Sequence, residues 1–162
     1  MKNGIIIFLL LLAFNVNGQN LFFIGEKSFI STEGFNLKSN SDESFINDLE
    51  IKFVKDEANR MIALSTKTEG VSFAGKLIIY LDNGMVITSS RESIFDYVDK
   101  LALAIFYLTD EDFSKLKSQN INTIKYSLKN KYGSDGAFGG NFSASNKSKI
   151  NFSEIISQFY KK

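Results

Sequence analysis

The chain has no cysteine, no histidine, no proline and no tryptophan among its 162 residues. Without cysteine there is no disulfide framework, no thiolate metal site and no cysteine for lipid attachment. Without histidine, Ser-His-Asp and Cys-His catalytic arrangements are excluded, together with the commonest zinc ligands. Without proline, every turn has to be made by Gly, Asn, Asp or Ser. We therefore expect a fold that is held by packing alone, with no metal and no cofactor.

Excess charge of either sign is also lacking. The sequence has 19 basic and 18 acidic side chains, and residues 1–18 contain one of the bases, Lys2, and none of the acids, so 18 of each remain beyond residue 18. Nucleic-acid binding depends on a clustered basic surface, so we expect no nucleic-acid partner. A near-neutral chain also lacks the charge that holds a protein to anionic lipid.

The N-terminus has the features of a secretory signal peptide. Lys2 supplies a positive start, residues 5–14 are an unbroken apolar run, and Val16-Asn17-Gly18 resembles a cleavage site. A membrane-spanning helix needs about 20 apolar residues, which is twice the length of this run. We predict that residues 1–18 are a signal peptide cleaved between Gly18 and Gln19. The mature chain would then be secreted or periplasmic, without a transmembrane segment.

The mature chain has the size of a single domain. Removing 18 of the 162 residues leaves 144, and a chain of that length can bury about two-thirds of its unfolded surface. With 44% apolar residues and sixteen phenylalanines it has the material for a core. We expect one globular domain over residues 19–162.

Several segments have the alternating pattern of strands with one wet face. Leu49, Ile51 and Phe53 alternate with charged residues. Asn83-Gly84 between two apolar runs predicts a hairpin with a type I′ turn, because both residues tolerate positive φ. Strands are predicted over residues 49–53, 61–66, 76–81, 85–88, 101–108 and 123–128, with 77–81 in the middle of the sheet and 55–59 as a polar connection. Residues 91–100 are ambiguous, since Phe95 and Val98 have helical spacing.

Two segments have helix signals. Thr109 followed by Asp112 resembles a capping box, which predicts a short helix near residues 110–119 with Phe113 facing inward. Asn151 is a plausible N-cap for a C-terminal helix in which Phe152, Ile156 and Phe159 line one face. The pattern as a whole predicts an α+β fold, a single antiparallel β-rich domain with two short helices.

Three carboxylates come close together in the sequence. Glu92, Asp96 and Asp99 would share one face if residues 92–100 were helical. The simplest interpretation is a solvated helix face, while calcium binding is a further option. The alternative is a histidine-independent hydrolase that uses these carboxylates, which requires two acids across a cleft in different environments.

Residues 132–141 are rich in glycine and polar residues and contain two aromatic side chains outside any strand or helix period. Long loops over a rigid sheet are where binding residues concentrate. We therefore consider a ligand-binding loop formed by Tyr132, Asp135, Phe138 and Asn141. The alternative is a plain surface loop, which is favoured because no polar constellation converges there.

Three segments of the chain resemble small exported proteins of unassigned function from Bacteroidota-type bacteria. They are residues 23–28 (FIGEKS), 75–84 (GKLIIYLDNG) and 142–147 (FSASNK). The resemblance implies export and a single domain, and it brings no activity or functional residue with it.

The hypothesis that follows is a non-catalytic binding or structural module of the bacterial envelope. It would bind an envelope protein or a glycan through loops or through an exposed sheet edge, where unpaired backbone groups provide affinity. A carboxylate hydrolase and an inhibitor of a secreted enzyme are the alternatives.

Overall fold

The structure, a computed structural model, describes residues 20–43, 46–57, 59–89, 93–130 and 139–161. Within these residues eleven strands and two helices form a single domain that is mostly antiparallel sheet. The strands are β1 (Asn20–Ile24), β2 (Lys27–Ser31), β3 (Phe35–Ser39), β4 (Leu49–Asp56), β5 (Asn59–Lys67), β6 (Val71–Leu81), β7 (Val86–Thr88), β8 (Ser93–Val98), β9 (Leu101–Tyr107), β10 (Ile121–Asn130) and β11 (Gly140–Ser145). The helices are α2 (Asp110–Ser118) and α3 (Phe152–Phe159).

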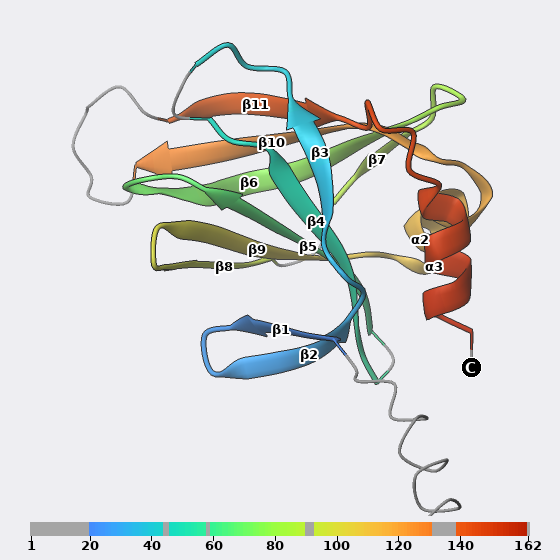
Figure 1. Ribbon diagram of the computed structural model, residues 1–162. Helices are drawn as coiled ribbons and strands as arrows, with labels where there is room; N and C mark the ends of the chain where they lie inside the picture. The colour runs from blue at the N-terminus through green and yellow to red at the C-terminus, as the bar shows by residue number, and fades with distance from the viewer. Residues whose placement is uncertain (1–19, 44–45, 58, 90–92, 131–138, 162) are drawn as a thin grey trace, which may run out of the picture.

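The sheet curls into a half-barrel (Figure 1). Its strand order is β7-β6-β10-β11-β3-β4-β5-β9-β8, and every pairing among the described strands is antiparallel. β6 approaches β8 and β9 across the interior, although no backbone ladder joins them in the described residues. The hairpin of β1 and β2 lies off this path and is attached through β2, which pairs with β4 at Ser31 and Val54.

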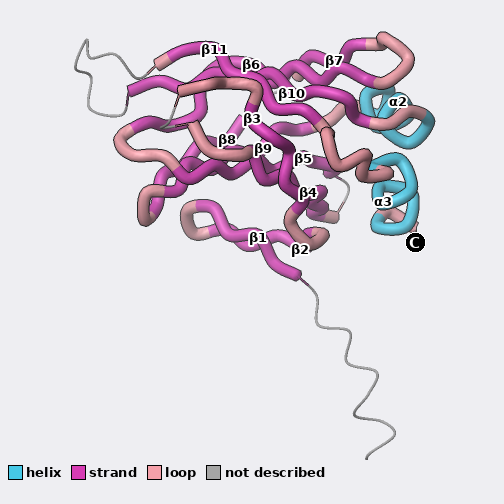
Figure 2. Tube along the Cα trace, turned by 45° about the horizontal axis from the view of Figure 1, so that its top comes forward, coloured by secondary structure: helices cyan, strands magenta, loops and turns pink. Residues whose placement is uncertain are grey.

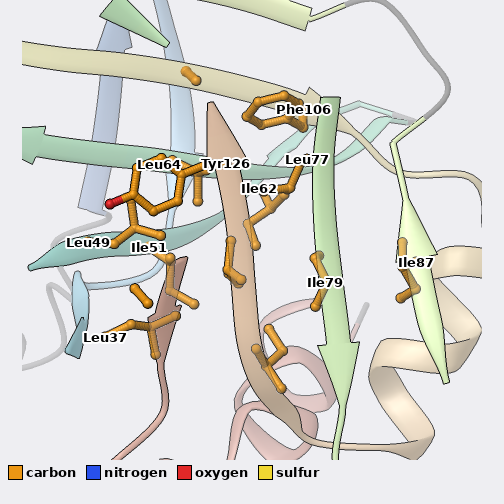
Figure 3. Close-up of a cluster of buried hydrophobic side chains, with 14 of the residues drawn as sticks. Leu37, Leu49, Ile51, Ile62, Leu64, Leu77, Ile79, Ile87, Phe106 and Tyr126 are labelled. Carbon is orange, nitrogen blue, oxygen red and sulfur yellow. The ribbon is translucent and has the colours of Figure 1, made fainter. Parts of the chain in front are cut away.

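The concave side of the sheet holds the main core (Figure 3). Alternation places Leu49, Ile51 and Phe53 of β4 inside, fully buried, with Glu50 and Lys52 on the outer face. β5, β6, β9 and β10 contribute in the same way. The predicted antiparallel β-rich domain is confirmed, and sheet dominates over helix in it.

Both helices lie at one end of the half-barrel (Figure 2). α3 directs Phe152 into the core, where its ring makes edge contacts with Phe35 at 5.8 Å and Phe53 at 6.0 Å between centroids. Tyr160, the C-cap of α3, connects the end of the helix to β4 and β5. Its hydroxyl donates to the carbonyl oxygens of Val54 at 2.7 Å and Met61 at 3.3 Å. α3 therefore closes this end of the core rather than lying on the surface.

The N-terminus of α2 has a complete capping box. The backbone N–H of Asp112 donates to Thr109 Oγ1 at 3.1 Å, and the N–H of Thr109 donates to Asp112 Oδ2 at 3.2 Å. Both groups would otherwise be without an intrahelical partner, which is why this pair begins the helix here. Arg60 of β5 forms an ion pair with Asp110 in the same turn.

Replacing Thr109 by alanine is expected to lower the free energy of unfolding by about 1 kcal/mol, because an N-cap acceptor is lost. Urea denaturation measures the change. Thr88→Ala is the matched control, since Thr88 is exposed on β7 and caps nothing. Equal effects of the two substitutions would contradict the capping role.

A second, smaller core lies on the outer face of the sheet. Phe22, Ile24 and Phe29 of the β1–β2 hairpin are buried against the outward side chains of β4, β5 and β9. These outward side chains are Val54, Met61, Ala63, Leu103 and Ile105. The hairpin therefore forms a partial second layer beneath the half-barrel, visible below β8 and β9 in Figure 1.

The structure corrects three of the sequence predictions and assigns a strand to part of the segment that was ambiguous. The β6–β7 connection is not a type I′ turn, because only Gly84 has positive φ, and the Gly84 N–H donates to Leu81 O and the Leu81 N–H to Met85 O. These bonds define a three-residue loop ending in a left-handed glycine. β6 lies next to the end of the strand order rather than in its middle. Residues 93–98 form strand β8, and most of the predicted connection 55–59 belongs to β4 and β5.

Candidate functional site: an outer groove beside β1

A groove of about 450 Å³ lies on the outer face, where the β1–β2 hairpin leaves the sheet uncovered. Its floor is the outward side of β5, β8 and β9, and its wall is the end of β1. The lining residues are Phe23, Ile24, Gly25, Lys67, Asp96, Val98, Asp99, Leu101 and Leu103. A volume of this size falls within the range of about 300–1,000 Å³ that is typical of ligand sites.

Two tight turns position the rim of this groove. Gly25 begins the β1–β2 turn with φ +55° while Glu26 has negative φ, which is the type II′ pattern that requires glycine first. Asp99 and Lys100 both have positive φ, at +51° and +64°, so the β8–β9 turn is type I′. The outer face therefore ends in two hairpin tips.

Asp96 joins the two hairpins. Its carboxylate accepts the backbone N–H of Gly25 at 2.9 Å and that of Tyr97 at 2.7 Å. The hydroxyl of Tyr97 in turn accepts from the Gly70 N–H at 3.0 Å and donates to Thr68 O at 3.2 Å. Asp96 thus positions the wall of the groove against its floor.

The lining of the groove is mainly apolar and partly open to solvent. Phe23 is 63% exposed and Val98 is 48% exposed, and these two are the most exposed large apolar side chains among the described residues. Leu101 is half-buried beside them. Two of the exposed large apolar side chains of the described residues therefore lie at one groove.

A second hollow of about 430 Å³ adjoins the groove and shares Lys67 and Leu101 with it. It is polar, and its remaining lining residues are Asn36, Ile46, Asn47, Asp48, Glu50, Ser65 and Thr66. Lys38 donates to Asp48 at 2.6 Å, and this hydrogen bond lowers the pKa of the Asp48 carboxyl. The outer face thus changes from apolar at the hairpin tips to acidic and amide-rich beyond Lys67.

Besides Asp96, whose carboxylate accepts two backbone N–H groups, two charges on the lining of the groove have no ion-pair partner in the described part of the chain. They are the Lys67 ammonium and the Asp99 carboxylate, both exposed. The neighbouring charges are paired, since Lys100 donates to Glu69 at 2.5 Å and this bond lowers the pKa of Glu69. Lys67 and Asp99 are therefore available to a bound partner.

The structure brings together two of the three carboxylates that the sequence analysis considered, Asp96 and Asp99. Asp96 and Asp99 both line the groove, but on a strand and a turn rather than on one helix face. Glu92 lies outside the described residues. No cluster of three or more acidic side chains that could hold a metal ion occurs among the residues the structure describes.

The predicted binding loop does not contribute to this groove in the described residues. Tyr132, Asp135 and Phe138 lie outside them, as do Gly18 and Gln19 at the predicted cleavage site. Asn141 is on β11, where its Oδ1 accepts from Ser127 Oγ at 2.7 Å across the β10 ladder. It is not among the residues that line the groove.

Phe23 lines the groove but is not among the binding residues that the sequence predicts. The strand pattern of residues 20–24 is hidden because Leu21, Phe22, Phe23 and Ile24 are all apolar, and a continuous run does not reveal which face is covered. A usable signal was Gly25-Glu26 after this run, followed by Phe29 and Ile30, which together are typical of a hairpin.

The fold and the groove define a class: a β-rich single domain of curled antiparallel sheet, with an open apolar groove on its outer face. Comparison with protein-family models, with curated proteins and with solved structures finds no match to this chain. In the described residues no helix has the length and apolar character needed to cross a membrane.

Proposed function

We propose that the mature chain is an exported, non-catalytic binding module of the bacterial envelope, and that its partner binds in the outer groove. The observation that carries the proposal is the exposure of Phe23 and Val98 at one apolar groove of about 450 Å³. Their burial by a partner would gain roughly 25 cal/mol for each Å² of apolar surface removed from water. The apolar run of residues 5–14 supports export.

The roles of the polar groups support binding over catalysis. The Asp96 carboxylate is occupied by two backbone N–H donors, which fix it as a positioning group. Hydrolysis by a pair of carboxylates would require two acids held at one reacting centre in contrasting environments. The groove instead has an apolar floor with charges at its margin. Such a lining favours binding of a partner's side chain over catalysis.

Replacing Phe23 by lysine is expected to abolish capture of the partner while leaving the fold intact. The test expresses C-terminally tagged chain in its source cells, cross-links with formaldehyde and purifies the tagged protein. Wild type should retain an envelope protein or glycan, and Phe23→Lys should lose it, because a hydrated ammonium then occupies the wall of the groove.

Val86→Lys is the matched control. Val86 is also a solvent-exposed apolar residue, at 45%, but it lies on β7 at the opposite end of the strand order from β8. Equal retention by both variants would contradict a role for the groove. Recovery of chain that still begins at Met1 in a soluble intracellular fraction would contradict export.

The hydrolase alternative has one specific observation in its favour, since Asp96 and Asp99 line the same groove. It predicts hydrolysis of glycans, peptides or esters by the mature protein, lost in Asp96→Asn or Asp99→Asn. Such an activity would replace the binding proposal.

A further inference from the structure

We propose that the groove accepts an extended peptide, which adds as a third strand beside β1 and carries a basic residue two positions from an apolar one, on the same face. This inference rests on the proposed function and specifies the chemistry of its partner. Three features of the outer face lead to it: a free strand edge, an uncovered apolar floor and an excess of carboxylates around the groove.

The free edge belongs to β1. In the described part of the chain β1 pairs only with β2. The two-residue turn at Gly25-Glu26 makes Ile24 and Lys27 a hydrogen-bonded pair, and such pairs alternate along an antiparallel ladder. The backbone N–H and C=O of Leu21 and Phe23 therefore point away from β2, toward the open side.

β1 also lacks the devices that usually protect an edge strand. Asn20-Leu21-Phe22-Phe23-Ile24 contains no charge and no proline, and its pairing with β2 has no bulge. Unprotected edges are templates for pairing with a further strand. Strand addition draws affinity from backbone hydrogen bonds and specificity from alternate side chains.

The floor beside this edge is the uncovered part of the outer face. The β1–β2 hairpin already covers one part of that face, with Phe22 and Ile24 buried in the outer core. β1 is the strand of the hairpin that lies toward β8 and β9 (Figure 1). A strand added beside β1 would extend the same layer over Val98 and Leu101, so that an apolar side chain of the peptide would fill the groove.

The charges along the groove favour a basic residue in the peptide. Asp96 and Asp99 line it against the single ammonium of Lys67. The carboxylates of the adjoining hollow, Asp48 and Glu50, pair with Lys38 and Lys52, so the lining of the groove keeps an excess of one negative charge. Asp99 has no ion-pair partner in the described residues. A lysine or arginine in the peptide would therefore meet an uncompensated carboxylate at the rim.

The test uses capped seven-residue peptides with the mature protein in isothermal titration calorimetry. The first peptide alternates Thr and Val, with a central Leu and one Lys two positions from it, so that both side chains share one face. The second replaces Lys by Glu, and the third is the first peptide N-methylated at alternate amides. We expect the first peptide to bind and both others to bind at least about tenfold more weakly, since one loses the charge contact and the other the ladder.

Asp99→Lys should reverse the preference between the Lys and Glu peptides, and Val86→Lys should leave it unchanged. Equal binding of the N-methylated peptide would overturn strand addition, and equal binding of the Glu peptide would overturn the charge assignment. Light scattering that shows a dimer lost in Phe23→Lys would assign the edge to a second copy of the chain, which also overturns the inference. If no peptide binds while Phe23-dependent capture from cells persists, the peptide inference fails and the binding function stands.

Discussion

Replacing Phe152 by alanine is expected to lower the free energy of unfolding by about 3–5 kcal/mol. Phe152 is fully buried, and its ring lies between Phe35 of β3 and Phe53 of β4. Truncation removes apolar contacts to both strands and leaves a cavity that the surrounding sheet cannot refill, because cores are packed at crystal-like density. Urea denaturation followed by circular dichroism measures the loss.

Phe23→Ala is the matched control for this experiment, since it is the same chemical change at a side chain that is 63% exposed. We expect a change within about 0.5 kcal/mol, as for most surface substitutions. The two substitutions should therefore have different effects. Phe152→Ala is expected to destabilise the fold, and Phe23→Ala is expected to weaken partner capture. A loss below about 1 kcal/mol for Phe152→Ala would contradict the role of α3 in closing the core.

Removing the hydroxyl groups of two tyrosines should change stability in opposite directions. The Tyr126 hydroxyl is buried within the half-barrel and has no hydrogen-bond partner among the described residues, whereas that of Tyr160 donates to Val54 O and Met61 O. Tyr126→Phe is expected to raise the free energy of unfolding by about 1 kcal/mol, because an unsatisfied buried polar group is removed. Tyr160→Phe is expected to lower it by about 1–2 kcal/mol, since both carbonyl contacts are lost. The same sign for both variants would contradict this assignment.

High pH should also destabilise the protein through these two residues. Burial, with a smaller contribution from the negative charge of Asp48, raises the pKa of Tyr126 from 10.0 to about 12, and burial raises the pKa of Tyr160 as well. Because the folded-state pKa lies above the unfolded value, stability is complete below pH 10 and falls as the unfolded state ionises first. Between pH 10 and 12 Tyr126 alone should remove about 3 kcal/mol.

Denaturation series at pH 8 and pH 11.5 measure this loss. Tyr126→Phe should reduce the difference between the two series, because its ring no longer ionises in either state. An unchanged difference would show that Tyr126 is not responsible.

Much of the sheet could be predicted because its strands have one wet face. β4 alternates strictly, and its inward residues Leu49, Ile51 and Phe53 are fully buried. β9 is largely apolar, and its outward Leu103 and Ile105 are buried in the outer core with the β1–β2 hairpin, whereas Leu101 is half-buried at the groove. Local patterns of two-residue period therefore predicted part of the sheet, while β1, β2, β3 and β8 were not predicted as strands.

The candidate site could not be predicted, because it arises from contacts between distant segments. Residues 20–24 and 96–103 are brought together by the Asp96 to Gly25 hydrogen bond, which spans 71 positions in the sequence. Residues 93–98 have helical spacing at Phe95 and Val98, and pairing with β9 overrides it. The sequence pattern of charged residues indicated Asp96 and Asp99, but it did not indicate Phe23, which lies beside them in the groove.

Hydrogen exchange by mass spectrometry on the mature protein, with and without the lysine-containing peptide, tests the central claim most directly. The account predicts slower amide exchange at Leu21 and Phe23, where backbone groups on the free edge of β1 acquire partners, and no change in β7. Unchanged exchange in β1 under saturating peptide, or protection confined to another face, would contradict it.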